Sequence, residues 1–194
     1  MCSNPIIAYH VPQEDEPTRR EVGAVMPNDF RVEPLTDGDR SLVETRWRAA
    51  WGGSVVVSRG RVHRPADVAG FKAVDDAGAL LGLVTYRRTE PAPELEVVSL
   101  DSDVEGRGVG TALLARVMEV ARTEGLVRVW LITTNDNVDA LRFYQRRGFR
   151  LVALHLDAVA AARAVKPSIP ERGPDGVPLR DEWELEWRVD AEPR

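Results

Sequence analysis

The chain has 194 residues, 43% of them hydrophobic and 29% charged, which is the composition of an ordinary globular protein with one sizeable core. Its formal net charge of −5 gives no electrostatic reason to expect nucleic acid or an anionic membrane as a partner, and no apolar run approaches the roughly 20 residues that span a bilayer. Cys2 is the only cysteine, which excludes an internal disulfide framework and a cysteine-based zinc site.

The N-terminal stretch comes first in chain order. Residues 1–28 carry prolines and mixed charge without a sustained period, so we expect a flexible leader. This stretch lacks the basic and apolar regions of a signal peptide, and we expect a cytoplasmic protein. Residues 30–35 predict a first strand. Thr36 is a candidate N-cap, and the apolar stripe after it predicts a helix that ends at Gly52 and Gly53.

The middle of the chain predicts short strands. Residues 54–57 (SVVV) predict one strand, and the arginine-rich residues 58–65 predict a loop. Residues 70–74 and 80–86 predict the two strands of a hairpin, because the residues between them, DDAG at 75–78, are a turn signal.

The C-terminal part continues to alternate between strands and helices. Residues 127–133 predict a strand, and a helix to Arg147 follows that either Thr134 or Asn137 can cap. The remaining elements are a strand over 150–157, a helix over 158–165, an irregular connection over 167–180 and a period-2 strand over 182–189. The total is about six or seven strands and three or four helices, a mixed α/β class without internal repeats.

Residues 95–111 carry the first chemical signal. An apolar, strand-like run leads into Gly106-Arg107-Gly108-Val109-Gly110, and a helical pattern follows at once and ends at Gly125. The unpaired N–H groups at such a helix start, together with the helix dipole, favour an anion such as a phosphate. Glycines in alternate positions leave no side chain to block its approach.

Three ligand types compete for this glycine turn. A nucleotide P-loop is excluded because no Lys-Ser or Lys-Thr follows the last glycine. A dinucleotide fingerprint fits poorly because Thr111 or Leu113 takes the place of its last glycine, although Asp136 falls where a ribose-binding acid is expected. An acyl-CoA pyrophosphate remains, against the plain alternative of a tight turn without a ligand.

A second motif decides between them. Residues 137–149 read N-x-x-A-x-x-F-Y-x-x-x-G-F. Here the chain resembles the GNAT superfamily of N-acetyltransferases, which pairs this signature with a [Q/R]-x-x-G-x-G cradle one βα unit earlier. The resemblance implies a GNAT domain over residues 29–190. Its fold is a mixed, mostly antiparallel sheet flanked by helices, in which the fourth and fifth strands splay apart.

The resemblance also implies that acetyl-CoA binds as a co-substrate, with no metal. Its pyrophosphate meets the turn formed by Glu105, Gly106, Arg107, Gly108, Val109, Gly110 and Thr111. Its peptide-like pantetheine arm pairs with the splayed strand edge at Val98, Ser99 and Leu100. Asn137 has an amide that can contact the pantetheine amides; the alternative is an N-cap of its helix, and one side chain could serve both at different times.

Three residues are candidates for the chemistry. Tyr144 matches the family's tyrosine beside the thioester sulfur, and a phenol with a pKa near about 10 is a reasonable proton donor to a thiolate; the alternative is a core tyrosine. Glu94 and Glu96 share one strand face, and either can take the proton of the attacking amine. The family's usual spacing from Gly110 implies Glu94, whereas matching the pattern E-x-x-S-L implies Glu96, which we prefer. The alternative is that both are solvated rim charges and that the base lies elsewhere or is water.

Other residues depart from the pattern or are weaker candidates. Glu105 stands where the family has glutamine or arginine, and a carboxylate is unfavourable beside a pyrophosphate unless Arg107 offsets it. Trp47 and Trp51 lie on the early helix that covers the acceptor groove in this family, and His63 lies in a loop that borders it. Each is a secondary candidate for an acceptor contact.

We therefore expect an acetyl-CoA-dependent N-acetyltransferase that acts on a primary amine of a small molecule or peptide. Direct attack in a ternary complex is expected because the sequence shows no well-placed cysteine or Ser/His pair for a covalent intermediate. The alternative is a non-catalytic acyl-CoA-binding or regulatory domain. The sequence does not identify the amine, and a homodimer is one option for the oligomeric state.

Overall fold

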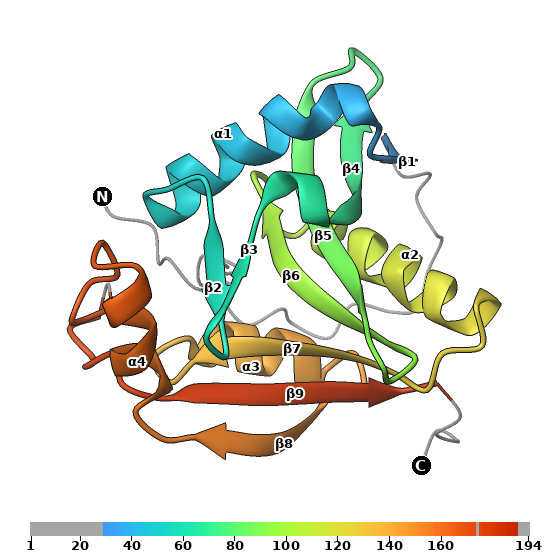
Figure 1. Cartoon of the computed structure of the whole chain (residues 1–194). Coiled ribbons are helices and arrows are strands. Elements are labelled where there is room, and N and C mark those ends of the chain that lie inside the picture. The colour runs from blue at the N-terminus through green and yellow to red at the C-terminus, as the bar shows by residue number, and fades with distance from the viewer. Residues whose placement is uncertain (1–28, 174, 190–194) are drawn as a thin grey trace, which may run out of the picture.

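A computed structural model describes residues 29–173 and 175–189 (Figure 1). The leader expected over residues 1–28 lies outside the described residues, as does Cys2. The strands are β1 (Phe30–Pro34), β2 (Val56–Ser58), β3 (Arg61–His63), β4 (Ala69–Asp75), β5 (Leu80–Thr89), β6 (Glu94–Ser102), β7 (Arg128–Thr134), β8 (Arg150–His155) and β9 (Glu182–Arg188). The helices are α1 (Arg40–Trp51), α2 (Val109–Thr123), α3 (Val138–Gln145) and α4 (Ala158–Val165), with short 3-10 turns η1 (Asp37–Asp39) and η2 (Pro65–Asp67).

Within the described residues, seven of the strands form one mixed sheet in the order β1-β4-β5-β6-β7-β9-β8, and β2 and β3 form a separate hairpin. All neighbours in the large sheet are antiparallel except β6 and β7, which are parallel. This mostly antiparallel sheet with its helices confirms the predicted fold class.

The strands β6 and β7 separate about halfway along β6. They pair from Glu94↔Arg128 to Val97↔Leu131, and beyond that point β6 pairs only with β5 while β7 pairs only with β9. A bulge at the same level leaves Val98 outside the β5–β6 register. We call the resulting gap between the two strands the split. In chain order β6 and β7 are the fourth and fifth strands of the large sheet, so they are the splayed pair that the fold prediction requires.

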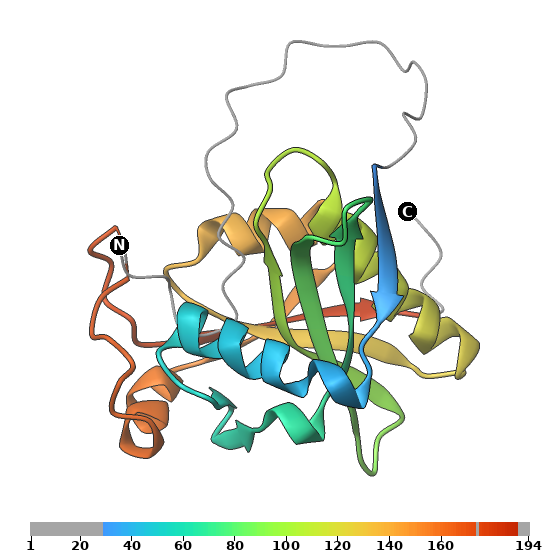
Figure 2. The same cartoon turned by 90° about the horizontal axis from the view of Figure 1, so that it is seen from above.

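Helices cover both faces of the sheet. Figure 2 shows α1 and the β2–β3 hairpin on one side and α2 and α3 on the other. The larger core joins the sheet to α2 and α3 through buried residues such as Leu95, Leu113 and Tyr144, and a second core joins it to α1 through Trp47 and Trp51. Alternate residues of β6, β7 and β9 therefore meet different layers.

The prediction that Thr36 caps the first helix is wrong, because Thr36 is the N-cap of the short turn η1 and Asp39 is the N-cap of α1. Asp39 Oδ2 accepts hydrogen bonds from the backbone nitrogen and the hydroxyl of Thr36, each at 2.8 Å, and Lys72 Nζ donates to Asp39 Oδ1 at 2.7 Å. The hydrogen bond from Lys72 is the main reason that the pKa of Asp39 falls to about 2. The turn η1 separates Thr36 from the first residue of α1.

The prediction of a loop over residues 58–65 is wrong, because β3 lies inside it. Ser58 pairs with Arg61, and the two residues between them have positive φ angles, 47° at Arg59 and 72° at Gly60. This is the backbone of a type I′ hairpin turn, which usually carries Asn-Gly. The sequence signal was missing because an arginine occupies the first left-handed position.

Among the described residues, none of the helices combines the length and the apolar character needed to cross a membrane.

Candidate active site

The glycine turn between β6 and α2 has the backbone that an anion cradle requires. Gly106 and Gly108 have φ angles of 66° and 77°, and Gly108 is the N-cap of α2. A Cβ atom added to either glycine would have no heavy atom within 4 Å, so the surroundings are open and glycine is required by the backbone conformation. Val109 and Gly110 are buried in the first turn of α2, whereas Thr111 is exposed.

The charges beside the cradle differ from the expected compensation of Glu105 by Arg107. Both residues are exposed, and Arg107 forms an ion pair with Asp29 at 2.6 Å. The arginine that reaches the start of α2 is Arg147, whose Nε donates to Thr111 Oγ1 at 3.1 Å and whose guanidinium stacks 3.5 Å from the Phe143 ring centre. Sequence reasoning missed Arg147 because it occupies a variable position of the second motif.

The predicted pantetheine edge lies along the β6 side of the split. Val98, Ser99 and Leu100 are buried, and their strand has no β7 partner at this level. The Ser99 hydroxyl faces α1, where Trp47 Nε1 donates to it at 3.1 Å and Thr85 Oγ1 lies 2.6 Å away. The Ser99 side chain is therefore structural, and only its backbone faces the split.

Residues of the second motif lie on the α3 side of the sheet. Asn137 is the N-cap of α3, and its Oδ1 accepts from the backbone nitrogen of Ala140 at 3.0 Å, so the capping alternative is realised. The amide nitrogen of Asn137 takes no part in that cap. Tyr144 is fully buried, with its ring centre 5.1 Å from that of Phe143 and 5.3 Å from that of Phe149.

The carboxylate of Glu96 faces the opposite layer and is 1% exposed. Its Oε2 accepts from Arg87 Nε at 2.6 Å, and its Oε1 accepts from Ser58 Oγ at 2.7 Å. Both oxygens therefore have donors, and one of these donors is a charged guanidinium.

The hairpin brings a Ser/His pair to Glu96 that the sequence had not shown. His63 Nε2 lies 2.8 Å from Ser58 Oγ and 3.5 Å from Glu96 Oε1. Burial lowers the pKa of His63, although the nearby Glu96 acts in the opposite direction. Because the single hydroxyl proton of Ser58 goes to the carboxylate, His63 donates to Ser58 instead of deprotonating it. The pair is not arranged as a nucleophile and its base.

Glu94, the other predicted base, is tied into a second ion-pair cluster. Arg128 Nε lies 2.9 Å from Glu94 Oε1, and Arg128 Nη1 lies 3.1 Å from Glu184 and 3.0 Å from Glu186. These carboxylates raise the pKa of Arg128, against the effect of its burial. The structure thus places Glu94 and Glu96 on one face, as predicted, and gives each an arginine partner.

A row of three glutamates on β9, which we call the acidic row, lines the same face: Glu182, Glu184 and Glu186. The backbone nitrogen of Arg59 donates to Glu182 Oε2 at 3.2 Å, and Arg59 Nη1 donates to Glu184 Oε2 at 3.3 Å. The sequence predicted only a period-2 strand here. The contacts of the acidic row with Arg128 depend on the sheet order, which places β9 beside β7. His155 on β8 lies 3.0 Å from Glu184.

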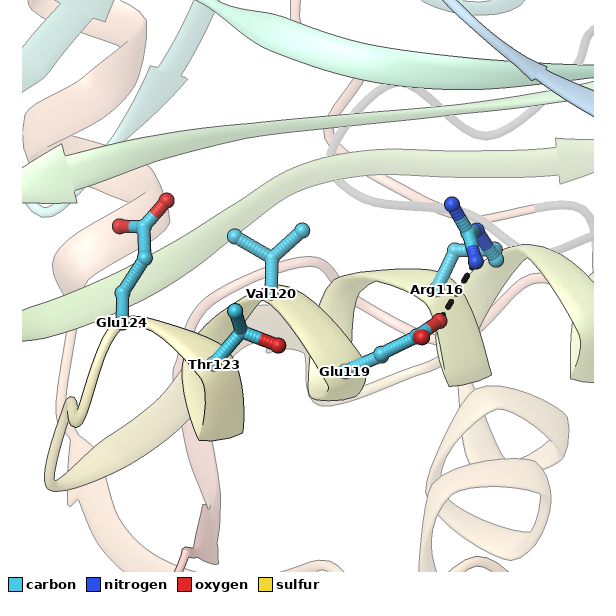
Figure 3. Close-up of a pocket in the computed structure, with 5 residues that line it drawn as sticks. All are labelled: Arg116, Glu119, Val120, Thr123 and Glu124. Atoms are coloured by element: carbon cyan, nitrogen blue, oxygen red, sulfur yellow. Dashed lines mark hydrogen bonds and ion pairs between the residues drawn. The ribbon is translucent and has the colours of Figure 1, made fainter.

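Trp47 and Trp51 are 0% and 1% exposed and belong to the core beneath α1, so in this structure neither reaches a groove. A shallow pocket elsewhere on the surface, on α2, is lined by Arg116, Glu119, Val120, Thr123 and Glu124 (Figure 3). None of the predicted site residues lines it. Among the described residues, no group of three or more His, Cys, Asp or Glu side chains is arranged to hold a metal ion.

A family model described as "Acetyltransferase (GNAT) family" matches residues 30–149. The chain belongs to the GNAT acetyltransferase family. It is therefore an acyltransferase of the N-acetyltransferase class, with the cradle at the start of α2 and the second motif on α3 in the expected order.

Known proteins place this GNAT domain among bacterial relatives. It is 38% identical over 153 residues to "Uncharacterized protein YxbD" of Bacillus subtilis (strain 168), covering 79% of this chain and 95% of the relative. It is 32% identical over 91 residues to streptothricin acetyltransferase of Streptomyces lavendulae, covering 46% of this chain and 48% of the relative.

Solved structures share the fold. "IAA acetyltransferase from Bacillus cereus ATCC 14579" has a TM-score of 0.62 at 20% identity and covers 82% of this chain and 99% of its own. A GNAT family acetyltransferase from Elizabethkingia anophelis, described as having acetyl-CoA bound, has a TM-score of 0.57 at 15% identity and covers 83% and 99%.

Proposed function

We propose that this GNAT domain, spanning residues 29–190, transfers the acetyl group of acetyl-CoA to a primary amine by direct attack in a ternary complex. The observation that carries the proposal is the split between β6 and β7. It leaves the β7-facing edge of β6 unpaired beyond Val97. This edge lies between the glycine cradle at one end and the carboxylate-rich face around Glu96 at the other. A coenzyme and an amine can therefore meet between the two.

The residues present fit acetyl-CoA, which supplies an activated acetyl thioester. The N–H groups of the open cradle over residues 105–111 suit its pyrophosphate, and the guanidinium of Arg147 beside Thr111 adds a positive charge there. The backbone of Val98, Ser99 and Leu100 offers a strand edge to the pantetheine amides. Exposed Glu105 opposes the pyrophosphate charge, so we expect it to weaken coenzyme binding.

In this proposal Tyr144 protonates the departing thiolate, and Asn137 contacts the pantetheine arm through its amide nitrogen while its oxygen caps α3. For the proton of the amine, Glu96 ranks ahead of Glu94 because Glu96 is buried beside the split. Each of these carboxylates must give up part of an arginine pair when it takes a proton. The acceptor is the amine of a small molecule or peptide, in keeping with the name of the streptothricin acetyltransferase relative.

Calorimetry with acetyl-CoA followed by a free-thiol release assay tests the proposal. The assay uses a panel of monoamines, diamines and short peptides with free N-termini. We expect binding of acetyl-CoA and amine-dependent release of thiol. Binding without turnover on any amine supports the alternative function, a non-catalytic acyl-CoA-binding or regulatory domain.

A homodimer is part of the same proposal, because β8 is the outer strand of the sheet and carries exposed apolar side chains. Leu151, Val152 and Leu154 are 46%, 44% and 53% exposed. An unpaired edge of this kind favours association with a second strand. Light scattering of the purified chain gives the mass; a monomer at all concentrations contradicts this part.

A further inference from the structure

Glu182, the first residue of β9, is a buried acid with a hydrogen-bond donor on only one of its two carboxylate oxygens. It is 0% exposed. Its Oε2 accepts from the backbone nitrogen of Arg59 at 3.2 Å, whereas its Oε1 has no hydrogen-bond partner among the described residues. A buried carboxylate oxygen without a donor is costly, so such an atom calls for a proton or a ligand to satisfy it.

Glu182 lies at the level of the sheet where β6 and β7 have separated. Glu182 pairs with Thr134 at the end of β7, three pairs beyond Leu131, where β7 has already left β6. On β9 the neighbouring Trp183 and Leu185 face the core that contains Tyr144, so Glu182 faces the opposite layer. The side chains of Tyr144 and Glu182 therefore lie on opposite faces of the sheet.

The β2–β3 turn links Glu182 to Glu96. Ser58 donates to the carboxylate of Glu96, and the next residue, Arg59, donates its backbone N–H to the carboxylate of Glu182. Figure 1 shows this hairpin lying in front of the sheet and reaching toward β7 and β9, with α3 behind β7. Two buried carboxylates therefore lie under one turn, on the face where the proposed reaction places the acceptor.

Among the described glutamates that β6 and β9 carry on this face, Glu182 is the one without an ion pair. Arg59 from the hairpin and His155 from β8 attract its charge, Glu96 from β6 repels it, and Glu184 beside it on β9 pairs with Arg59, Arg128 and His155. Burial outweighs the attractive charges and raises the pKa of Glu182. A general base works best when its pKa lies near the working pH, and burial is the usual way to move a glutamate there.

We propose that Glu182, in preference to either carboxylate on β6, receives the acceptor's protonated amine at the split and takes its proton. This inference rests on the proposed function. The acceptor class is a primary alkyl amine, which arrives as an ammonium ion and satisfies Oε1 by donating to it. One proton passes from nitrogen to Glu182, and the neutral amine attacks the thioester carbonyl.

In that step the new C–N bond forms, the C–S bond breaks, and the second proton of the nitrogen passes through solvent to replace the one that Tyr144 gives up, after which Glu182 releases its proton to solvent. The thiolate leaves as thiol with a proton from Tyr144. The overall balance is ammonium plus thioester giving amide, thiol and one released proton. Glu96 is then a positioning residue, which holds the hairpin through Ser58 so that the Arg59 N–H stays on Glu182.

Glu182→Gln tests the proposal, with Glu186→Gln as the matched control on the same strand and face. Glutamine keeps an oxygen for the Arg59 N–H, and melting temperature and acetyl-CoA affinity check that the site is intact. With the best amine of the panel, we expect Glu182→Gln to lower kcat/KM by about 100-fold or more and to remove the acid limb of its pH profile. Glu186→Gln retains that limb and most of the activity.

Glu96→Gln is the second variant, and it keeps the test decisive if Glu182→Gln does not fold. We expect it to lower kcat while the acid limb persists. The inference is overturned if Glu182→Gln keeps the limb or if Glu96→Gln loses it. Failure of the proposed function looks different, because the wild-type chain then releases no thiol with any amine; in that case the inference falls with it.

Discussion

Tyr144 is the residue whose chemistry and packing can be separated most cleanly. Its ring is wedged between Phe143 and Phe149 in the main core, so phenylalanine at this position keeps the ring contacts and removes only the hydroxyl. We expect Tyr144→Phe to lower kcat by about ten-fold or more, because the thiolate loses its proton donor, with little change in acetyl-CoA affinity.

Steady-state kinetics and calorimetry measure the two effects of Tyr144→Phe. Tyr86→Phe is the matched control, because Tyr86 is also buried and stacks on an aromatic ring, that of Phe71, at 6.0 Å between ring centres. Equal kcat values for wild type and Tyr144→Phe would remove the acid role, and an equal loss in Tyr86→Phe would point to a general packing defect.

Among the structural elements, the β6–α2 turn depends on glycine for its backbone. Gly108 has a φ of 77° with open space around it, so alanine there adds strain without a clash. We expect Gly108→Ala to cost about 1 kcal/mol of stability and also to weaken acetyl-CoA binding, because the new Cβ projects into the cradle. Thermal unfolding and calorimetry are the measurements.

Gly125 provides the control for this turn. It lies just beyond the other end of α2, with a φ of 65° and likewise no heavy atom within 4 Å of an added Cβ. Gly125→Ala should show a similar loss of stability with unchanged acetyl-CoA affinity. If both variants bind acetyl-CoA as the wild type does, the cradle is not the pyrophosphate site.

The elements were predictable wherever a strong local signal existed. The strands and helices of the α/β core follow from the hydrophobic period and from the residues that cap helices. Two motifs, each a continuous stretch of sequence, were enough to predict the family. The β2–β3 hairpin was not predictable, because its left-handed turn position carries Arg59 in place of asparagine. The contacts of Glu96 with Ser58 and His63 depend on that hairpin. Glu182 comes under the same hairpin only through the sheet order, so neither environment is visible in a local sequence pattern.

At the scale of the whole molecule, one ion-pair cluster ties α1 to the strand and loop that lead into the cradle. Arg46 on α1 forms a two-pronged pair with Asp103 in the loop and lies 3.4 Å from Asp101 at the end of β6. The Asp101 oxygens are buried and accept no hydrogen bond from the described residues. Burial raises the pKa of Asp101 to about 6, despite the attraction of Arg46.

This shift has a definite sign for stability. A carboxyl group whose pKa is higher in the folded state than the ordinary value of 3.8 binds more protons when folded, so its contribution to stability falls as pH rises from about 4 to about 6. Above pH 6 the buried charge costs at most about 3 kcal/mol, because one pKa unit corresponds to about 1.4 kcal/mol. Asparagine at this position removes the charge but also the attraction of Arg46, which keeps its pair with Asp103.

We therefore expect Asp101→Asn to raise the free energy of unfolding by about 1–2 kcal/mol at pH 7.5 and by much less at pH 5, where Asp101 itself is mostly protonated. Urea unfolding at the two pH values measures the difference. Asp103→Asn is the control, because Asp103 has a side chain that is 45% exposed and loses its Arg46 pair without relieving a buried charge. An Asp101→Asn variant that is destabilised equally at both pH values would show that the Arg46–Asp101 contact, and not the burial of charge, decides the stability of this junction between α1 and the cradle.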